Sequence, residues 1–269
     1  MTIAHLDNHQ IYYQLTGSPN QPVIMFLHGF MGNSQDWENI ISSLADKYRC
    51  LTLDLPGHGE TKTTGGDNAY TISYTAHALI QLLDYLNIDK CFLAGYSMGG
   101  RLALYTLLHY PDRFQTALLE SASPGLKTPQ EQSQRRQQDA QLAQQLETGD
   151  LSEFVRKWYQ QPLFATLQNH PQYAKLIQRR LQNNPQELAK SLRMMGTGQQ
   201  PSLWPQLPQN HIPLLLLAGE QDPKFIAINT EMAAACPAAK LAIIPQAGHN
   251  IHLEKLTVYL HQFSSVIFI

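Results

Sequence analysis

The sequence predicts an α/β protein with a mostly parallel, doubly wound sheet, and three features of its 269 residues support that fold class. Short apolar runs recur along the chain, segments with helical spacing separate them, and one long segment contains helical patterns alone. Apolar runs without polar alternation are typical of parallel strands buried on both faces. Strands that alternate with helices predict a sheet with helices on both sides.

Strands and helices follow from these patterns in chain order. The apolar runs cover residues 23–27, 50–53, 91–94, 116–119, 214–217 and 241–244. Apolar residues at helical spacing cover residues 37–44, 72–86 and 98–108. Between residues 124 and 208 no convincing strand occurs, and helical registers cover 131–146, 151–159 and 173–181. We therefore expect a core of residues 1–123 and 209–269 and a helical insertion of residues 124–208.

Composition narrows the classes of function. A 43% apolar fraction is sufficient for a sizeable core. A net charge of -2 without a long Lys or Arg run gives no reason to expect nucleic acid or an anionic membrane as partner. No stretch approaches the roughly 18 apolar residues of a membrane span, and the first ten residues lack a signal-peptide pattern. The expected ligands are therefore small molecules.

The cysteines predict a reducing compartment. Cys50, Cys91 and Cys236 lack C-x-x-C or metal-binding spacing, and an odd number cannot all pair within one chain. We expect free thiols, no metal site and a cytoplasmic location. Cys50 and Cys91 lie beside apolar runs and are interpreted as small strand-end residues.

Charge is divided unevenly between the insertion and the core. Residues 124–208 contain ten basic and six acidic residues, a formal charge of +4, whereas the remainder contains nine basic and fifteen acidic residues, or -6. Solvated helix faces account for many of these basic side chains. Two or three of them in a ligand site would be sufficient to favour an anionic ligand.

The segment GYSMG at residues 95–99 carries the clearest catalytic signal. It follows the apolar run 91–94 and precedes a helical pattern, which is the strand-turn-helix context that a G-x-S-x-G motif requires. Such a turn is strained and exposes the serine hydroxyl above the sheet. Ser97 is therefore the predicted reactive serine.

A serine hydroxyl needs an imidazole to take its proton and an acid to orient that imidazole. On such a sheet the expected chain order is serine, acid, histidine. Asp222 and His249 each follow a predicted strand end, where sites on parallel sheets form. Glu220 remains an alternative acid and His252 an alternative base.

The segment HGFMG at residues 28–32 follows another predicted strand. Its backbone can present the N–H of Phe30, together with that of Met98, to a reacting carbonyl oxygen. One such donor stabilises the transition state by about 3 kcal/mol. His28, and Asp54 and His58 in the nearby DLPGHG loop, are interpreted as structural residues.

Arg101 is unexpected because it follows Ser97 by four residues and therefore shares one face of a predicted buried helix. A cation in the first turn of a helix opposes the helix dipole, and burying it without an anion is costly. A structural carboxylate is one candidate counter-charge. A substrate carboxylate is the other, because a guanidinium binds carboxylates in bidentate geometry.

Taken together, the HGFMG turn, the DLPGHG loop, the serine turn, GEQD at 219–222 and the terminal Gly248-His249 pair resemble the α/β-hydrolase superfamily over essentially the whole chain. This resemblance implies a helical cap inserted after the sixth strand. It does not specify a reaction, because the superfamily contains esterases, C–C hydrolases, dehalogenases, lyases and non-catalytic members.

A narrower resemblance comes from WYQQPLF at 158–164 and GTGQQPSLW at 196–204, combined with Ser97 and Arg101. These segments are similar to the 2-succinyl-6-hydroxy-2,4-cyclohexadiene-1-carboxylate (SHCHC) synthases of menaquinone and phylloquinone biosynthesis. The resemblance implies a lyase that needs no cofactor and releases pyruvate from an enolpyruvyl cyclohexene with three carboxylates.

The same resemblance assigns roles to individual residues. The triad is Ser97, Asp222 and His249, and the oxyanion amides are those of Phe30 and Met98. The substrate contacts are Tyr96, Arg101, Arg135, Trp158 and Arg179. The Arg135-Arg136 and Arg179-Arg180 doublets leave open which member of each faces the substrate.

Two other classes of function remain as alternatives. A serine hydrolase could cleave an acidic ester, or a C–C bond in an acidic diketone. A non-catalytic relative could use the capped cavity for binding alone, although the intact acid, base and oxyanion turn argue against it.

Overall fold

A single sheet forms the centre of residues 2–267, which are the residues that the computed structural model describes. Its order is β1-β2-β4-β3-β6-β7-β8-β9, and β5 pairs with β2. The strands are β1 (Thr2–Leu6), β2 (His9–Thr16), β3 (Val23–Leu27), β4 (Arg49–Leu53), β5 (Lys62–Thr63), β6 (Cys91–Tyr96), β7 (Phe114–Glu120), β8 (Leu214–Gly219) and β9 (Ala239–Ile244). All pairings from β4 to β9 are parallel, which confirms the predicted fold class.

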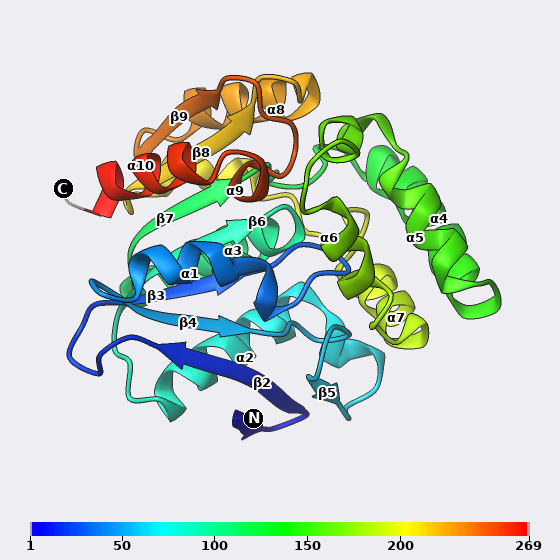
Figure 1. The fold of residues 1–269 in the computed structure, drawn as a ribbon, viewed down its shortest axis with the longest axis horizontal. Coiled ribbons are helices and arrows are strands. Elements are labelled where there is room, and N and C mark those ends of the chain that lie inside the picture. Colours follow the sequence, from blue (N-terminus) through cyan, green and yellow to red (C-terminus); the bar gives the residue numbers. More distant parts are fainter. Residues whose placement is uncertain (1, 268–269) are drawn as a thin grey trace.

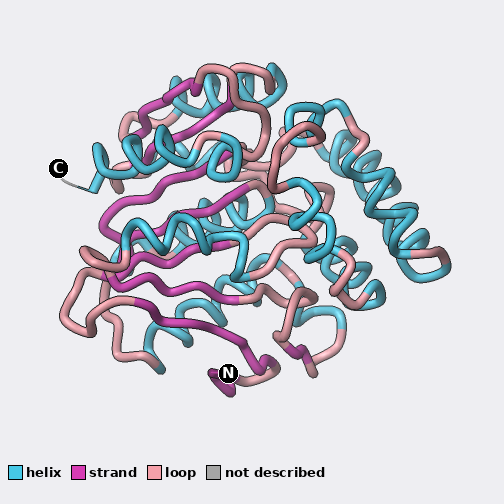
Figure 2. Tube along the Cα trace, in the orientation of Figure 1, coloured by secondary structure: helices cyan, strands magenta, loops and turns pink. Residues whose placement is uncertain are grey.

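Helices cover both faces of this sheet, as Figures 1 and 2 show. Those of the core are α1 (Glu38–Leu44), α2 (Ile72–Tyr85), α3 (Met98–His109), α8 (Pro223–Ala235), α9 (Ile251–Glu254) and α10 (Leu256–Ile267). Short 3-10 helices are η1 (Ser34–Trp37), η2 (Asp67–Tyr70), η3 (Pro111–Arg113), η4 (Pro162–Leu167) and η5 (Trp204–Gln209). Helices α2, α3 and α8 lie on one face, and α1 and α10 lie on the other.

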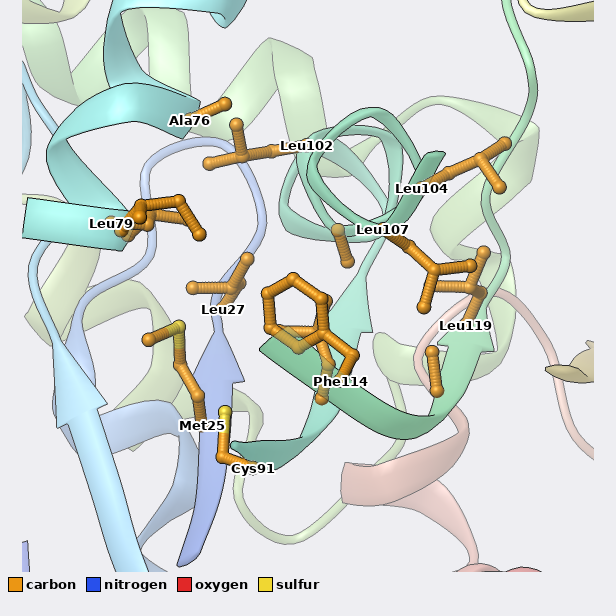
Figure 3. Close-up of a cluster of buried hydrophobic side chains, with 14 of the residues drawn as sticks. Met25, Leu27, Ala76, Leu79, Cys91, Leu102, Leu104, Leu107, Phe114 and Leu119 are labelled. Carbon is orange, nitrogen blue, oxygen red and sulfur yellow. The ribbon is translucent and has the colours of Figure 1, made fainter. Parts of the chain in front are cut away.

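Alternation along β3 shows how the strands join two cores. Met25 and Leu27 pack with α2 and α3 in one cluster, part of which Figure 3 shows. Ile24 and Phe26 point to the opposite face, where Trp37 packs. Each of these side chains is fully buried, and burial of one stabilises the fold by about 1.5–3 kcal/mol. The continuous apolar run of β3 is therefore explained by two buried faces.

The hairpin formed by β1 and β2 was not predicted from the sequence. Its strands pair antiparallel, and the burial of β2 alternates between buried and partly exposed residues. Apolar residues in such a strand alternate with polar ones, so no continuous apolar run marks it. With the two-residue β5 left out of the count, the insertion follows the sixth strand.

Residues 124–208 form a layer of helices beyond the carboxyl ends of the parallel strands, seen at the right of Figure 1. The helices are α4 (Pro129–Thr148), α5 (Leu151–Tyr159), α6 (Tyr173–Arg180) and α7 (Pro185–Met195). We call residues 124–208 the cap. The described cap residues contain no strand, and α7 had not been predicted. Cap residues form a third apolar cluster, which Met31 and Leu253 of the core join.

A buried ion pair joins the cap to the core. Both terminal guanidinium nitrogens of Arg180 in α6 donate to Asp36 of η1, at 2.9 and 2.7 Å. The Nε of Arg180 donates to the Tyr159 hydroxyl at 2.9 Å. Burial by itself would raise the pKa of the Asp36 carboxyl. The positive charges of Arg180 and Arg179 lower it by more, so the pKa lies below its ordinary value. The pair therefore persists in its charged form at neutral pH.

Among the described residues, no helix is both long and apolar enough to cross a membrane.

Candidate active site

Ser97 lies at the turn between β6 and α3, next to the point where the order of the strands reverses direction. Its backbone has φ 52° and ψ -108°, a strained conformation that costs about 1–3 kcal/mol. A Cβ at Gly99 would lie 2.2 Å from the carbonyl oxygen of Leu27, so this position of the turn admits glycine alone. The N–H of Ser97 donates to the carbonyl of Glu120 at 2.8 Å, which anchors the turn to β7.

Asp222 and His249 approach Ser97 from the ends of β8 and β9. His249 Nε2 lies 3.0 Å from Ser97 Oγ, and His249 Nδ1 lies 2.7 Å from Asp222 Oδ2. Asp222 also caps α8 by accepting from the N–H of Phe225. Both Asp222 and His249 are buried, so the carboxylate can hold the imidazole with Nδ1–H toward the acid and Nε2 free to accept the serine proton.

The alternative acid and base have other partners. Glu220 accepts a hydrogen bond from the backbone N–H of Gln246. His252 Nδ1 lies 2.7 Å from Glu120, and its backbone N–H donates to the same carboxylate. The Glu120 side chain thus fixes the helix that follows His249, while its backbone carbonyl holds Ser97. No sequence signal marked Glu120, because a lone acid at a strand end has many roles.

Phe30 and Met98 line the same cavity of about 420 Å³ as Ser97 and His249. Met98 is the first residue of α3, where backbone N–H groups have no partner within the helix. Met31 has φ 61°, and the N–H of Gly32 donates to the carbonyl of Gly29 at 2.9 Å, so the chain turns here. A Cβ at Gly29 would lie 2.7 Å from the Tyr96 ring, so only glycine lets this turn approach the nucleophile.

Histidines near the turn have structural contacts. His28 Nε2 accepts from the N–H of Leu55, and its Nδ1 contacts the carbonyl of Gly29. His58 Nδ1 donates to the carbonyl of Pro56. Asp54 accepts from the backbone N–H groups of Ser34 and Glu60. These contacts fix the loop and leave Ser97 with His249 as its neighbouring base.

The Arg101 side chain lines the cavity without a carboxylate bonded to it. Among residues 2–267, its hydrogen-bond acceptors are Gln200 Oε1 at 3.1 Å and the carbonyl of Met195 at 3.0 Å, both neutral. Burial and the neighbouring Arg135 lower the pKa of Arg101 to about 10, against the opposing effect of Asp139. A cation held this way favours an anionic ligand.

Arg135 and Trp158 line the same cavity from the cap. Arg135 Nε donates to the buried Asp139 one helical turn away, at 2.7 Å. The Trp158 ring lies 5.2 Å from the ring of Phe30 and 5.9 Å from that of Phe154, between centroids. Trp158 therefore connects the cap to the turn that carries the predicted oxyanion amide.

Arg179, expected as a substrate contact, is not among the residues that line this cavity. Its guanidinium donates to the carbonyl of Gln35 at 2.9 Å and lies 3.4 Å from Asp36. Arg180 binds the same carboxylate, so neither member of the doublet lines the cavity. The physical reason is Asp36, a buried carboxylate that needs positive charge around it.

Tyr96 also lies behind the cavity wall. It is 6% exposed, and its ring packs between those of His249 and His252, at 5.5 and 5.0 Å between centroids. The residue therefore supports the imidazole and does not line the open space.

Lys224 and Gln200 were not predicted from the sequence. Lys224 lines the cavity two residues after Asp222, a proximity that could have indicated it. Gln200, buried, joins Arg101 to the carbonyl of Ser123 through its own Nε2. Its position within GTGQQPSLW was a usable signal, but the pairing with Arg101 spans 99 residues.

The chain is similar to known proteins over most of its length. A family model described as alpha/beta hydrolase fold matches residues 22–256. A Bacillus subtilis (strain 168) protein, named as a candidate SHCHC synthase, is 40% identical over 234 residues, which cover 86% of this chain and 85% of that relative. The SHCHC synthase of Escherichia coli O1:K1 is 36% identical over 238 residues, 88% of this chain and 90% of the relative.

A solved structure agrees with these relatives. MenH from S. aureus superposes with a TM-score of 0.89 and 35% identity, over 97% of this chain and 98% of that one. Because the superposition covers 97% of this chain, the agreement includes the cap. The chain belongs to the α/β-hydrolase fold family and, within it, to the 2-succinyl-6-hydroxy-2,4-cyclohexadiene-1-carboxylate synthases.

Proposed function

We propose that this protein is an SHCHC synthase of menaquinone or phylloquinone biosynthesis. It eliminates pyruvate from 2-succinyl-5-enolpyruvyl-6-hydroxy-3-cyclohexene-1-carboxylate. The observation that carries this proposal within the site is Arg101, a half-buried guanidinium one turn from Ser97 whose acceptors are neutral. A neutral ester would leave this cation uncompensated, whereas a tricarboxylate supplies its counter-charge.

The first step is removal of a proton. Ser97 takes the ring proton next to the succinyl carbonyl while its own hydroxyl proton moves to His249 Nε2, 3.0 Å away. Asp222 orients the imidazole and stabilises its charged form. The backbone N–H groups of Phe30 and Met98 hold the enolate oxygen that forms as the C–H bond breaks.

The second step breaks a bond to oxygen. The enolate electrons move through the ring double bond, the C–O bond to the enolpyruvyl group breaks, and the departing enolate receives the proton from His249 to become pyruvate. Water is not consumed and no acyl enzyme forms. Arg101 and Arg135 hold carboxylates so that the ring proton faces Ser97.

The decisive experiment measures pyruvate release with a coupled lactate dehydrogenase assay. The enolpyruvyl substrate is generated in situ by the preceding enzyme, and the spontaneous rate is subtracted. Ser97→Ala should abolish the enzymatic release, because the base is lost. The synthase function would be contradicted if the wild type released pyruvate no faster than background, or if a serine-linked acyl group were trapped. Either result would favour hydrolysis of an acidic ester or diketone.

We also infer a small-molecule tricarboxylate as partner and a cytoplasmic location. The three cysteines are free and buried, and burial raises the pKa of Cys50 and Cys91 to about 12, so both thiols resist oxidation.

A further inference from the structure

Four basic side chains line the cavity: Arg101, Lys127, Arg135 and Lys224. Lys127 forms an ion pair with Glu231 and lies over the Trp204 ring, 4.5 Å from its centroid. Arg135 is paired with Asp139. Arg101 and Lys224 thus remain as the cavity cations without a carboxylate partner among residues 2–267.

Lys224 is placed close to the reacting groups. It is the second residue of α8, and Asp222 caps that helix. The centroid of the Phe225 ring lies 4.7 Å from that of the His249 ring. Lys224 Nζ lies 5.5 Å from the same Phe225 centroid. Within residues 2–267, Lys224 has no hydrogen-bond acceptor or ion-pair partner. Its ammonium group is therefore available to a ligand in the cavity.

Lys224 is exposed, but its place on the helix does not favour a cation. A positive charge in the first turn of a helix opposes the helix dipole. Partial removal of water lowers the pKa of Lys224, and Arg135 lowers it further, while Asp222 opposes them. Lys224 lies near the start of α8 and Arg101 near the start of α3. Both helices begin at the carboxyl edge of the sheet. A bound anion would offset the unfavourable interaction of both cations with the helix dipoles.

The number of charges points the same way. The proposed substrate has three carboxylates, and Arg179, expected as one of its contacts, is bound to Asp36. We propose that Lys224, which lines the cavity where Arg179 does not, binds a carboxylate of the substrate. This inference rests on the proposed function. Lysine suits the position because its flexible stem lets a compact charge follow a substrate group.

Kinetics test the inference first. Lys224→Met keeps the length of the side chain and removes the charge, so kcat/KM for pyruvate release should fall about ten- to hundredfold, mainly through KM. Lys224→Arg should restore most of the loss. The control is Lys90→Met, an exposed lysine at the opposite edge of the sheet, which should behave as wild type. A structural role would instead lower the melting temperature and resist rescue by arginine.

A second readout does not depend on turnover. Benzene-1,2,4-tricarboxylate is a stable ring tricarboxylate, and its affinity can be measured by isothermal titration calorimetry. Lys224→Met should weaken it about tenfold, whereas Lys224→Arg and Lys90→Met should not.

The two readouts separate the two proposals. If the wild type releases no pyruvate above background but binds the probe through Lys224, the synthase function fails and the inference stands. If the wild type turns over and Lys224→Met equals it in both readouts, the inference fails and the function stands. A protein that neither turns over nor binds the probe overturns both.

Discussion

Arg101 shows how a single residue can be placed for function at the expense of stability. Its half-buried guanidinium lies one turn from Ser97, and Gln200 and a backbone carbonyl accept its hydrogen bonds without neutralising its charge. A buried cation without an anion is unfavourable, and strain or uncompensated charge is typical of functional sites. The position therefore gives opposite expectations for stability and for activity.

Replacing Arg101 by methionine should separate these effects. Loss of a charge-assisted bond worth about 1.5–3 kcal/mol should lower kcat/KM about 10- to 150-fold. The melting temperature should stay equal or rise, because the uncompensated charge is gone. Steady-state kinetics and thermal unfolding of the same preparations check both. A variant with unchanged kcat/KM would show that Arg101 binds no carboxylate.

His58 predicts a pH dependence of stability. Burial lowers its pKa well below the ordinary value, and the neighbouring His28 and Arg180 lower it further. The unfolded protein therefore binds the extra proton first, so stability is complete above about pH 6.5 and falls as the pH drops toward the folded pKa, by up to about 1.4 kcal/mol per pH unit.

Urea unfolding between pH 5 and 8 measures this effect. His58→Asn keeps a donor for the carbonyl of Pro56 and removes the titrating group, so its stability should depend less steeply on pH. Curves that remain parallel for the wild type and the variant would contradict the assignment, whatever the absolute stability of the variant.

At the scale of elements, the cap is held to the core by a contact between η1 and α6. Asp36 accepts two hydrogen bonds from Arg180 and lies near Arg179, and all three side chains are buried. Removing one partner of a buried pair leaves the other charge unpaired, which costs more than replacing both.

Asp36→Asn should therefore lower the free energy of unfolding by about 3–5 kcal/mol, whereas Asp36→Leu combined with Arg180→Met should recover most of it. Urea denaturation at pH 7 measures both. The folded pKa of Asp36 is depressed, so its contribution is present above the unfolded value of about 3.9 and is lost as the pH falls through the folded value. If Asp36→Asn were as stable as the wild type at pH 7, the ion pair of Asp36 with Arg180 would not be what holds the cap to the core.

On the scale of the whole molecule, a cap of formal charge +4 covers a core of charge -6, and the cavity lies where they meet. Much of the cap charge is neutralised locally, as in the pairs of Arg193 with Glu147 and Lys157 with Glu153. The field that a substrate meets is therefore that of the few cations that line the cavity.

A polyanionic substrate should accordingly react more slowly at high salt. The Debye length falls from about 30 Å at 0.01 M to about 10 Å at 0.1 M, so attraction toward the cavity weakens. We expect kcat/KM to fall across a NaCl series while kcat changes little, and Arg101→Met to show a shallower dependence. A wild-type kcat/KM that is independent of salt would count against an anionic substrate.

Features that depend on local periodicity and on short motifs follow from the sequence. Buried strands such as β3 show as apolar runs, and the turn around Ser97 needs glycines at fixed spacing, so the doubly wound sheet and the candidate triad could be predicted. Which cations face the cavity depends instead on how the chain packs in three dimensions. Arg180 reaches Asp36 across 144 residues and the same carboxylate takes Arg179, while Lys224 is left open to the cavity. No local sequence pattern indicates these pairings, because the partners of each charged side chain are distant in sequence and meet only in the folded protein.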